Sequence, residues 1–96
     1  MISFEEALSI IRKLYPNDLV RECIVYKGTF IFAISIGKKF YQDDVAVFFI
    51  SVDGNKKTKL FDYWDELLNN KDDDFVKAIK NPIYVDVTKQ MLEGGD

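Results

Sequence analysis

The residues of this chain that could bind a metal ion or transfer a proton are its carboxylates, because the sequence contains no histidine. Histidine is the commonest general base near neutral pH and the commonest metal ligand, so its absence removes Ser-His and Cys-His nucleophile pairs. Asp43-Asp44 and Asp72-Asp73-Asp74 could supply oxygen ligands to a divalent cation if they met in space. Helix capping and exposure in solvated loops explain both clusters more simply. We therefore expect no metal, no other cofactor and no catalytic carboxylate pair.

The single cysteine, Cys23, lies among apolar residues in a stretch that is expected to form a strand. One cysteine excludes an intramolecular disulfide, and one cysteine without histidine excludes a tetrahedral zinc site. Because a reactive thiol needs exposure and a lowered pKa, we expect Cys23 to be buried and structural. Asp53 and Asn55 resemble the start of an EF-hand loop, but Trp64 stands where its twelfth-position glutamate is required.

The residues that most favour a binding role are aromatic, since tyrosine and tryptophan dominate the hot spots of protein interfaces. One group follows the central hairpin, and a second pair lies in the longest irregular stretch, residues 37–44. Tyr63 and Trp64 are adjacent, so a helix cannot bury both on one narrow stripe, and one of them is left for a partner. The alternative is that the aromatic residues after the hairpin, Phe61, Tyr63 and Trp64, have only a structural role and pack on the core. The candidate partner-binding residues are Phe40, Tyr41, Tyr63, Trp64 and Asp65.

Length and composition indicate a single domain, residues 1–96, with a frayed tail from about residue 88. Its formal charge of −3 argues against nucleic acid as the main partner, because phosphate binding needs a concentrated basic face. No apolar run approaches the length of a membrane span, and the N-terminus lacks the pattern of a signal peptide. We expect a cytoplasmic protein without a membrane partner.

The elements are expected to be organised around residues 45–60, VAVFFISVDGNKKTKL. The apolar run 45–52 is typical of a strand that is covered on both faces, or on one face and part of the other. Asp53-Gly54 predicts a hairpin turn in which Gly54 supplies a positive φ. The returning strand begins at Thr58 and continues to Phe61.

Helical spacing predicts an amphipathic helix from Phe4 to Tyr15, which Ser3 caps. Two strands, 19–26 and 29–36, follow and are joined at Lys27-Gly28. In the second of them, one face is the better core candidate, and it carries Phe30, Phe32, Ile34 and Ile36.

Beyond Phe61 the apolar period changes and predicts short helices. One spans 62–68 with Asp62 as its cap, and another spans 75–80 with Asp74 as its cap. Residues 83–87 have the composition of an additional edge strand. The fold class is therefore α+β, with an N-terminal helix packed on a four-stranded antiparallel meander and short C-terminal helices.

Three segments carry a resemblance to known proteins: VYKGTFIFAISIG, VAVFFISVDGNKKTKLFDYWDEL and FVKAIKNPI. Their order and their VDGNKKT hairpin resemble small uncharacterised proteins that siphophages and prophages of Gram-positive bacteria encode near head-assembly genes. The layout is also similar to bacterial toxin immunity proteins, which are acidic α+β domains that block a toxin by surface complementarity. Neither resemblance implies catalytic residues. Both imply a non-enzymatic protein that binds a protein partner or forms a homo-oligomer, first as a phage accessory or structural-cluster protein and alternatively as an immunity protein.

Overall fold

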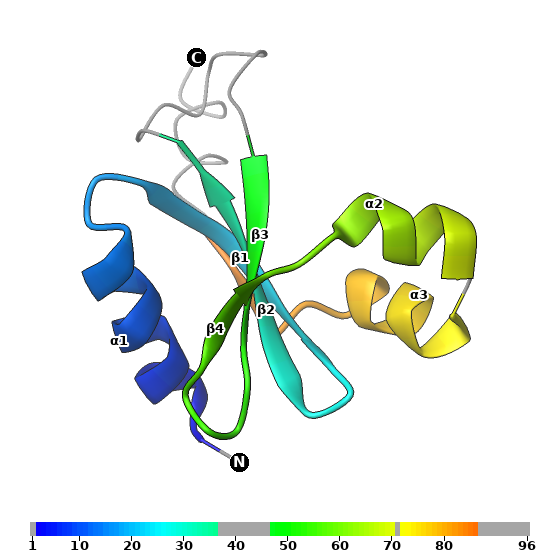
Figure 1. Ribbon diagram of the computed structural model, residues 1–96, viewed down its shortest axis with the longest axis horizontal. Coiled ribbons are helices and arrows are strands. Elements are labelled where there is room, and N and C mark those ends of the chain that lie inside the picture. The colour runs from blue at the N-terminus through cyan, green and yellow to red at the C-terminus, as the bar shows by residue number, and fades with distance from the viewer. Residues whose placement is uncertain (1, 37–46, 71, 87–96) are drawn as a thin grey trace.

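The structure is a computed structural model of the 96-residue chain, and it describes residues 2–36, 47–70 and 72–86 (Figure 1). It has an N-terminal helix, an antiparallel sheet and short C-terminal helices, which confirms the predicted α+β class. The elements are α1 (Phe4–Leu14), β1 (Leu19–Tyr26), β2 (Thr29–Ser35), β3 (Val47–Val52), β4 (Thr58–Leu60), α2 (Tyr63–Asp65), the π-helix η1 (Glu66–Asn70), α3 (Asp73–Lys80) and β5 (Tyr84–Val85).

The sheet has the strand order β4-β3-β2-β1-β5, so its first four strands form the predicted meander. The expected additional strand is present as β5, which is shorter than the 83–87 segment and pairs antiparallel with β1. Strand β3 pairs with β2 along its whole length but with β4 over only three residues, Ile50 to Val52. The β4 side of β3 is therefore covered by strand pairing only at its C-terminal half.

Helix α1 covers one face of the sheet (Figure 1). The Ser3 hydroxyl accepts a hydrogen bond from the Glu6 backbone N–H at 3.1 Å, as the sequence predicts for a capping box. Ala7 and Ile11 of α1 are fully buried against Phe32 and neighbouring residues of the sheet. We call this cluster the α1-side core.

The opposite face of the sheet is also buried, because α2 and α3 fold back over it (Figure 1). Here Ile31 of β2 packs with Tyr26 and with Phe75 of α3, and we call this cluster the α3-side core. The expectation that one face of β2 carries the core is thus incomplete. Ile36 was also wrongly placed in that face: it lies beyond the end of β2 and is 57% exposed.

Both predicted hairpin turns are formed, but only in the first does a glycine have a positive φ. Lys27 and Gly28 have φ values of 51° and 72°, which is the two-residue turn that matches the twist of the strands. In the β3–β4 turn the positive φ, 64°, belongs to Lys56 and not to Gly54. The reason is that the Asp53 carboxylate accepts the backbone N–H groups of Asn55 and Lys57, at 2.8 and 3.0 Å, and builds a longer loop.

The C-terminal helices begin where carboxylates accept backbone N–H groups. Asp62 caps α2 by accepting the Asp65 N–H at 3.0 Å, as predicted, although the following turn is a π-helix. The cap of α3 was wrongly predicted: Asp72 and not Asp74 holds that position and accepts the Asp74 N–H at 2.9 Å. Tertiary contacts decide this choice, because Asp72 also contacts the β1–β2 hairpin.

Candidate functional site

The predicted partner-binding residues have different positions in the structure. Phe40 and Tyr41 lie outside the described residues. Tyr63, Trp64 and Asp65 form the short helix α2, directly after the sheet. Of the two predicted aromatic groups, only the second lies within the described residues.

Tyr63 is the structural member of the adjacent aromatic pair. Its ring stacks on Phe49 of β3 with a centroid distance of 4.4 Å and an interplanar angle of 13°. It also meets the ring of Phe75 edge to face at 5.4 Å. Burial is the main cause, and the charge of Glu22 the second, of a raised pKa for the Tyr63 hydroxyl. Tyr63 thus fixes α2 to the α3-side core.

Trp64 is the surface member of the pair, with 61% of its area exposed. Its ring contacts the Tyr63 ring edge to face at a centroid distance of 5.1 Å. Tyr63 packs on Phe49. Because adjacent residues of a helix point in different directions, Trp64 then lies at the surface.

Trp64 lies on a surface groove at the end of β4. We call this the Trp64 groove, and its lining consists of Val47, Phe48, Phe49, Leu60, Phe61, Asp62, Tyr63 and Trp64. Leu60 is the most exposed large apolar side chain of the described residues, at 70%, and Val47 is also exposed. Neither residue was predicted as part of a site. The adjacent apolar pair Leu60-Phe61 is the sequence signal that could have identified Leu60. Neighbouring strand residues point to opposite faces, so Leu60 points away from the α3-side core that Phe61 enters.

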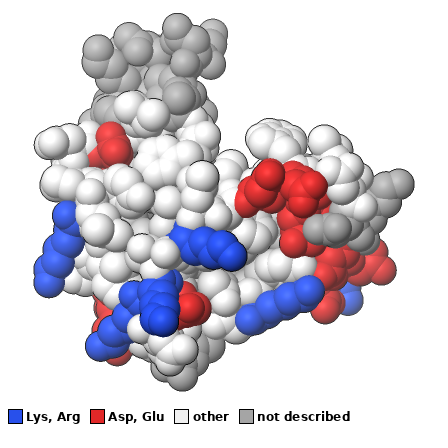
Figure 2. All heavy atoms as spheres, viewed as in Figure 1, with Lys and Arg blue, Asp and Glu red and all other residues white. Residues whose placement is uncertain are grey.

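One carboxylate, Asp62, lines the Trp64 groove, and a second, Asp65, follows three residues later in α2. Asp62 caps the helix, and Asp65 accepts a hydrogen bond from the Asn69 side-chain amide at 2.7 Å. Neither carboxylate forms an ion pair with a described lysine or arginine; Lys27 and Lys56, for example, pair with Asp72 and Glu6. Figure 2 shows acidic atoms gathered over the α2 and α3 side of the molecule. The groove is therefore apolar at its base and acidic along one border.

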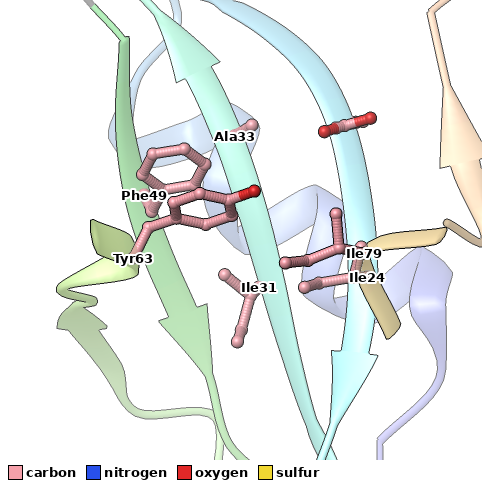
Figure 3. Close-up of a pocket in the computed structure, with 7 residues that line it drawn as sticks. Ile24, Ile31, Ala33, Phe49, Tyr63 and Ile79 are labelled. Carbon is pink, nitrogen blue, oxygen red and sulfur yellow. The ribbon is translucent and has the colours of Figure 1, made fainter. Parts of the chain in front are cut away.

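A second hollow lies between the sheet and the C-terminal helices (Figure 3). Figure 3 shows Phe49 and Tyr63 with their rings side by side and three isoleucines close by, Ile24, Ile31 and Ile79. Its free volume is about 10 Å³, which is no more than one water molecule needs. This hollow is a packing gap of the α3-side core, and it is too small for a substrate.

The thiol of Cys23 is fully buried in the α1-side core, as the sequence predicts. Burial raises its pKa to about 12. The thiolate, which is the nucleophilic form, is therefore scarcely populated near neutral pH, and Cys23 has the character of a small apolar core residue.

The acidic run at 72–74 belongs to a structural contact in the described part of the chain. The Tyr26 hydroxyl donates to Asp72 at 2.5 Å, and the Lys27 ammonium lies 3.2 Å from the same carboxylate. The hydrogen bond from Tyr26 is the largest cause, and the Asp74 backbone N–H the second, of a lowered pKa for Asp72. No group of three or more acidic or cysteine side chains within the described residues could hold a metal ion. The other acidic pair, Asp43-Asp44, lies outside these residues.

The lowered pKa of Asp72 predicts a pH-dependent contribution to stability. A carboxyl group whose pKa is lower in the folded state stabilises fully above its ordinary value of 3.8, and this stabilisation is lost as the pH falls through the lower, folded-state value. We expect Asp72→Asn, which can still cap α3, to melt at a lower temperature than the parent at pH 7. The difference should shrink in melts recorded at successive pH values below about 3.8. A difference that stays constant down to pH 2 would contradict this role of Asp72.

Comparisons with protein-family models, with curated proteins and with solved structures find no match to this chain. Within the described segments, none of the helices combines the length and the apolar character that a membrane crossing requires.

Proposed function

We propose that this chain is a non-enzymatic protein that acts by binding a protein partner through the Trp64 groove. The observation that supports it best is the exposure of Trp64 and Leu60 beside a half-buried Tyr63 that stacks on Phe49. A tryptophan that is already held in place loses little conformational freedom on binding, and this is the usual property of an interface anchor.

The resemblance to phage and prophage proteins of the head-assembly region gives this proposal its biological setting. Such a chain would be an accessory or structural-cluster protein whose partner is encoded nearby. The apolar base of the groove fits a partner that buries an apolar side chain there, since contiguous exposed apolar surface is typical of interaction sites.

The test is a pull-down from the native host with the parent chain and with Trp64→Ala. Truncating a hot-spot residue costs about 2 kcal/mol or more of binding free energy, which is roughly a thirtyfold loss of affinity. The captured partner should therefore be lost from Trp64→Ala and be measured as a weaker complex by titration calorimetry.

The matched control is Leu14→Ala, which truncates another exposed apolar residue, 52% exposed, at the end of α1. It should retain the partner. If Trp64→Ala captures the same partner with unchanged affinity, the Trp64 groove is not the binding surface and the proposal fails.

A second candidate function is that of an immunity protein, and the acidic side of the molecule favours it (Figure 2). Such proteins neutralise a toxin by matching its surface charge, and an acidic surface suits a basic toxin site. Gene neighbourhood separates the two candidates, because capsid and portal genes accompany the first and a toxin gene directly upstream accompanies the second. Co-expression with that toxin would then rescue growth only if the immunity function holds.

A further inference from the structure

We infer that the partner presents an extended, basic segment that adds as a strand to β3 beside Val47, beyond the end of β4, with an apolar side chain in the Trp64 groove. This inference rests on the proposed function and specifies the chemistry of the partner. Three features of the described residues support it: the hydrogen-bonding direction of β3, the exposed side chains beside it and the carboxylates at the border.

The first feature is the backbone of β3. Its odd-numbered residues direct their N–H and C=O groups toward β4: the Asp53 N–H donates to the Lys57 carbonyl at 3.0 Å, and the Phe49 carbonyl accepts the Phe61 N–H at 2.8 Å. The two-residue repeat of a strand gives Val47 the same direction. The chain turns away after Phe61, where the Tyr63 N–H donates to the Phe61 carbonyl at 3.1 Å.

No described strand therefore lies opposite Val47 on the β4 side, although Val47 is still paired with Ser35 of β2 on its other side. Among the described strands, β4 leaves this short stretch of the β3 edge unpaired, next to the groove. Peptides in extended form bind to such edges through backbone hydrogen bonds and obtain specificity from side-chain pockets beside the edge. A helical segment would not use these backbone groups, and this favours an extended occupant.

The second feature is the arrangement of apolar side chains next to this edge. Leu60 and Trp64, both mainly exposed, lie on the groove together with Val47. In an added strand every second side chain points to the same face. Leu60 is paired with Ile50 of the α1-side core, whereas Trp64 contacts Tyr63 on the α3 side. Consecutive side chains of an added strand point to opposite faces, so one apolar side chain of the partner can contact Trp64 and the next can contact Leu60 while the backbone pairs beside Val47.

The third feature is the charge at the border. Asp62 lines the groove and Asp65 follows it in α2, and no described lysine or arginine forms an ion pair with either carboxylate. Glu66 continues the acidic run into the next turn. A lysine or arginine in the partner segment would find a complementary charge here. A second copy of this chain is less suitable, because two grooves that face each other would bring these carboxylates together.

The experiment is a selection from a displayed library of random twelve-residue peptides on the immobilised parent chain, with counter-selection on Trp64→Ala. We expect enriched peptides that contain lysine or arginine near an apolar residue. Synthetic copies should bind in an extended form, so that N-methylation at alternate residues abolishes binding while methylation at the residues between has little effect. The amide resonances of residues 47–49 should shift on titration.

The charge contribution is tested with Asp62→Asn/Asp65→Asn, which keeps the side-chain shape. Each exposed ion pair contributes about 0.2–1 kcal/mol, so the loss of two carboxylates should weaken binding of the selected peptides about two- to thirtyfold at low salt. Asp73→Asn/Asp74→Asn is the matched control, because it removes the same charge from the first turn of α3, away from the groove lining, and should bind normally.

Enrichment of acidic or helical peptides would overturn the inference, as would binding that tolerates N-methylation at every position. Dimerisation of the parent chain that Trp64→Ala abolishes would also overturn it, since the occupant would then be a second copy. These results leave the proposed function standing if Trp64→Ala still loses the host partner. The proposed function fails only if that partner is retained.

Discussion

Replacing Phe75 with alanine is expected to lower the free energy of unfolding by about 3–5 kcal/mol, as for other fully buried aromatic residues. Phe75 has no exposed area, and its ring lies between those of Tyr26, Phe61 and Tyr63 at centroid distances of 5.0, 5.7 and 5.4 Å. It is the fully buried residue of α3 in the contact with the sheet, where Ala78 and Ile79 also pack. The substitution leaves a cavity in the α3-side core. Chemical denaturation monitored by circular dichroism measures the resulting decrease in the free energy of unfolding.

Leu68→Ala is the control for this prediction, because Leu68 belongs to the same helical region but is 62% exposed. Its effect should stay within about 0.5 kcal/mol, as for ordinary surface changes. If Phe75→Ala loses less than about 1 kcal/mol, the C-terminal helices are not coupled to the folding of the sheet. Hydrogen exchange would then show α3 amides that open independently of β2.

The two adjacent aromatic residues of α2 are expected to respond very differently to the same truncation. Tyr63→Ala removes a ring that stacks on Phe49 and contacts Phe75, and we expect a loss of about 2–3 kcal/mol from packing and aromatic contact together. Trp64→Ala removes a mainly exposed ring and should change stability by no more than about 0.5 kcal/mol. Thermal and denaturant unfolding of both variants measure the difference.

This comparison also decides how the binding test is interpreted. A stable Trp64→Ala chain that loses its partner identifies Trp64 as an interface residue, because the fold is intact. A loss of several kcal/mol in Trp64→Ala would instead make Trp64 a core residue and end its proposed role as an anchor. Equal losses in the two variants would contradict the division of roles between Tyr63 and Trp64.

The local elements of the fold could be predicted because they depend on neighbouring residues. Ser3 and Glu6 specify the start of α1, and Lys27-Gly28 specifies a tight turn, whatever the rest of the chain does. The β3–β4 turn could not be predicted in detail. Its two-residue Asp-Gly signal was outweighed by the hydrogen bonds that Asp53 accepts, which place the positive φ at Lys56.

The candidate site could be predicted only in part for a related reason. The sequence indicates that Tyr63 and Trp64 cannot both be buried on one helical stripe, but periodicity over a three-residue helix does not say which is exposed. Leu60 and Val47 were not predicted as site residues, because the groove forms where β4 ends and the chain leaves the sheet. For Leu60 the pair Leu60-Phe61 was an available signal, whereas nothing in the sequence indicates Val47.

By itself, the sequence determined the α+β order, the meander, the helix caps at Ser3 and Asp62, and a chemistry without histidine. These properties follow from composition and from short-range hydrogen bonding and periodicity. Only the tertiary structure decided that both faces of β2 are buried, that Asp72 caps α3, and that Trp64 is exposed while Tyr63 is packed. The physical reason is that these outcomes depend on contacts between residues far apart in the chain, such as Phe49 with Tyr63 and Tyr26 with Asp72.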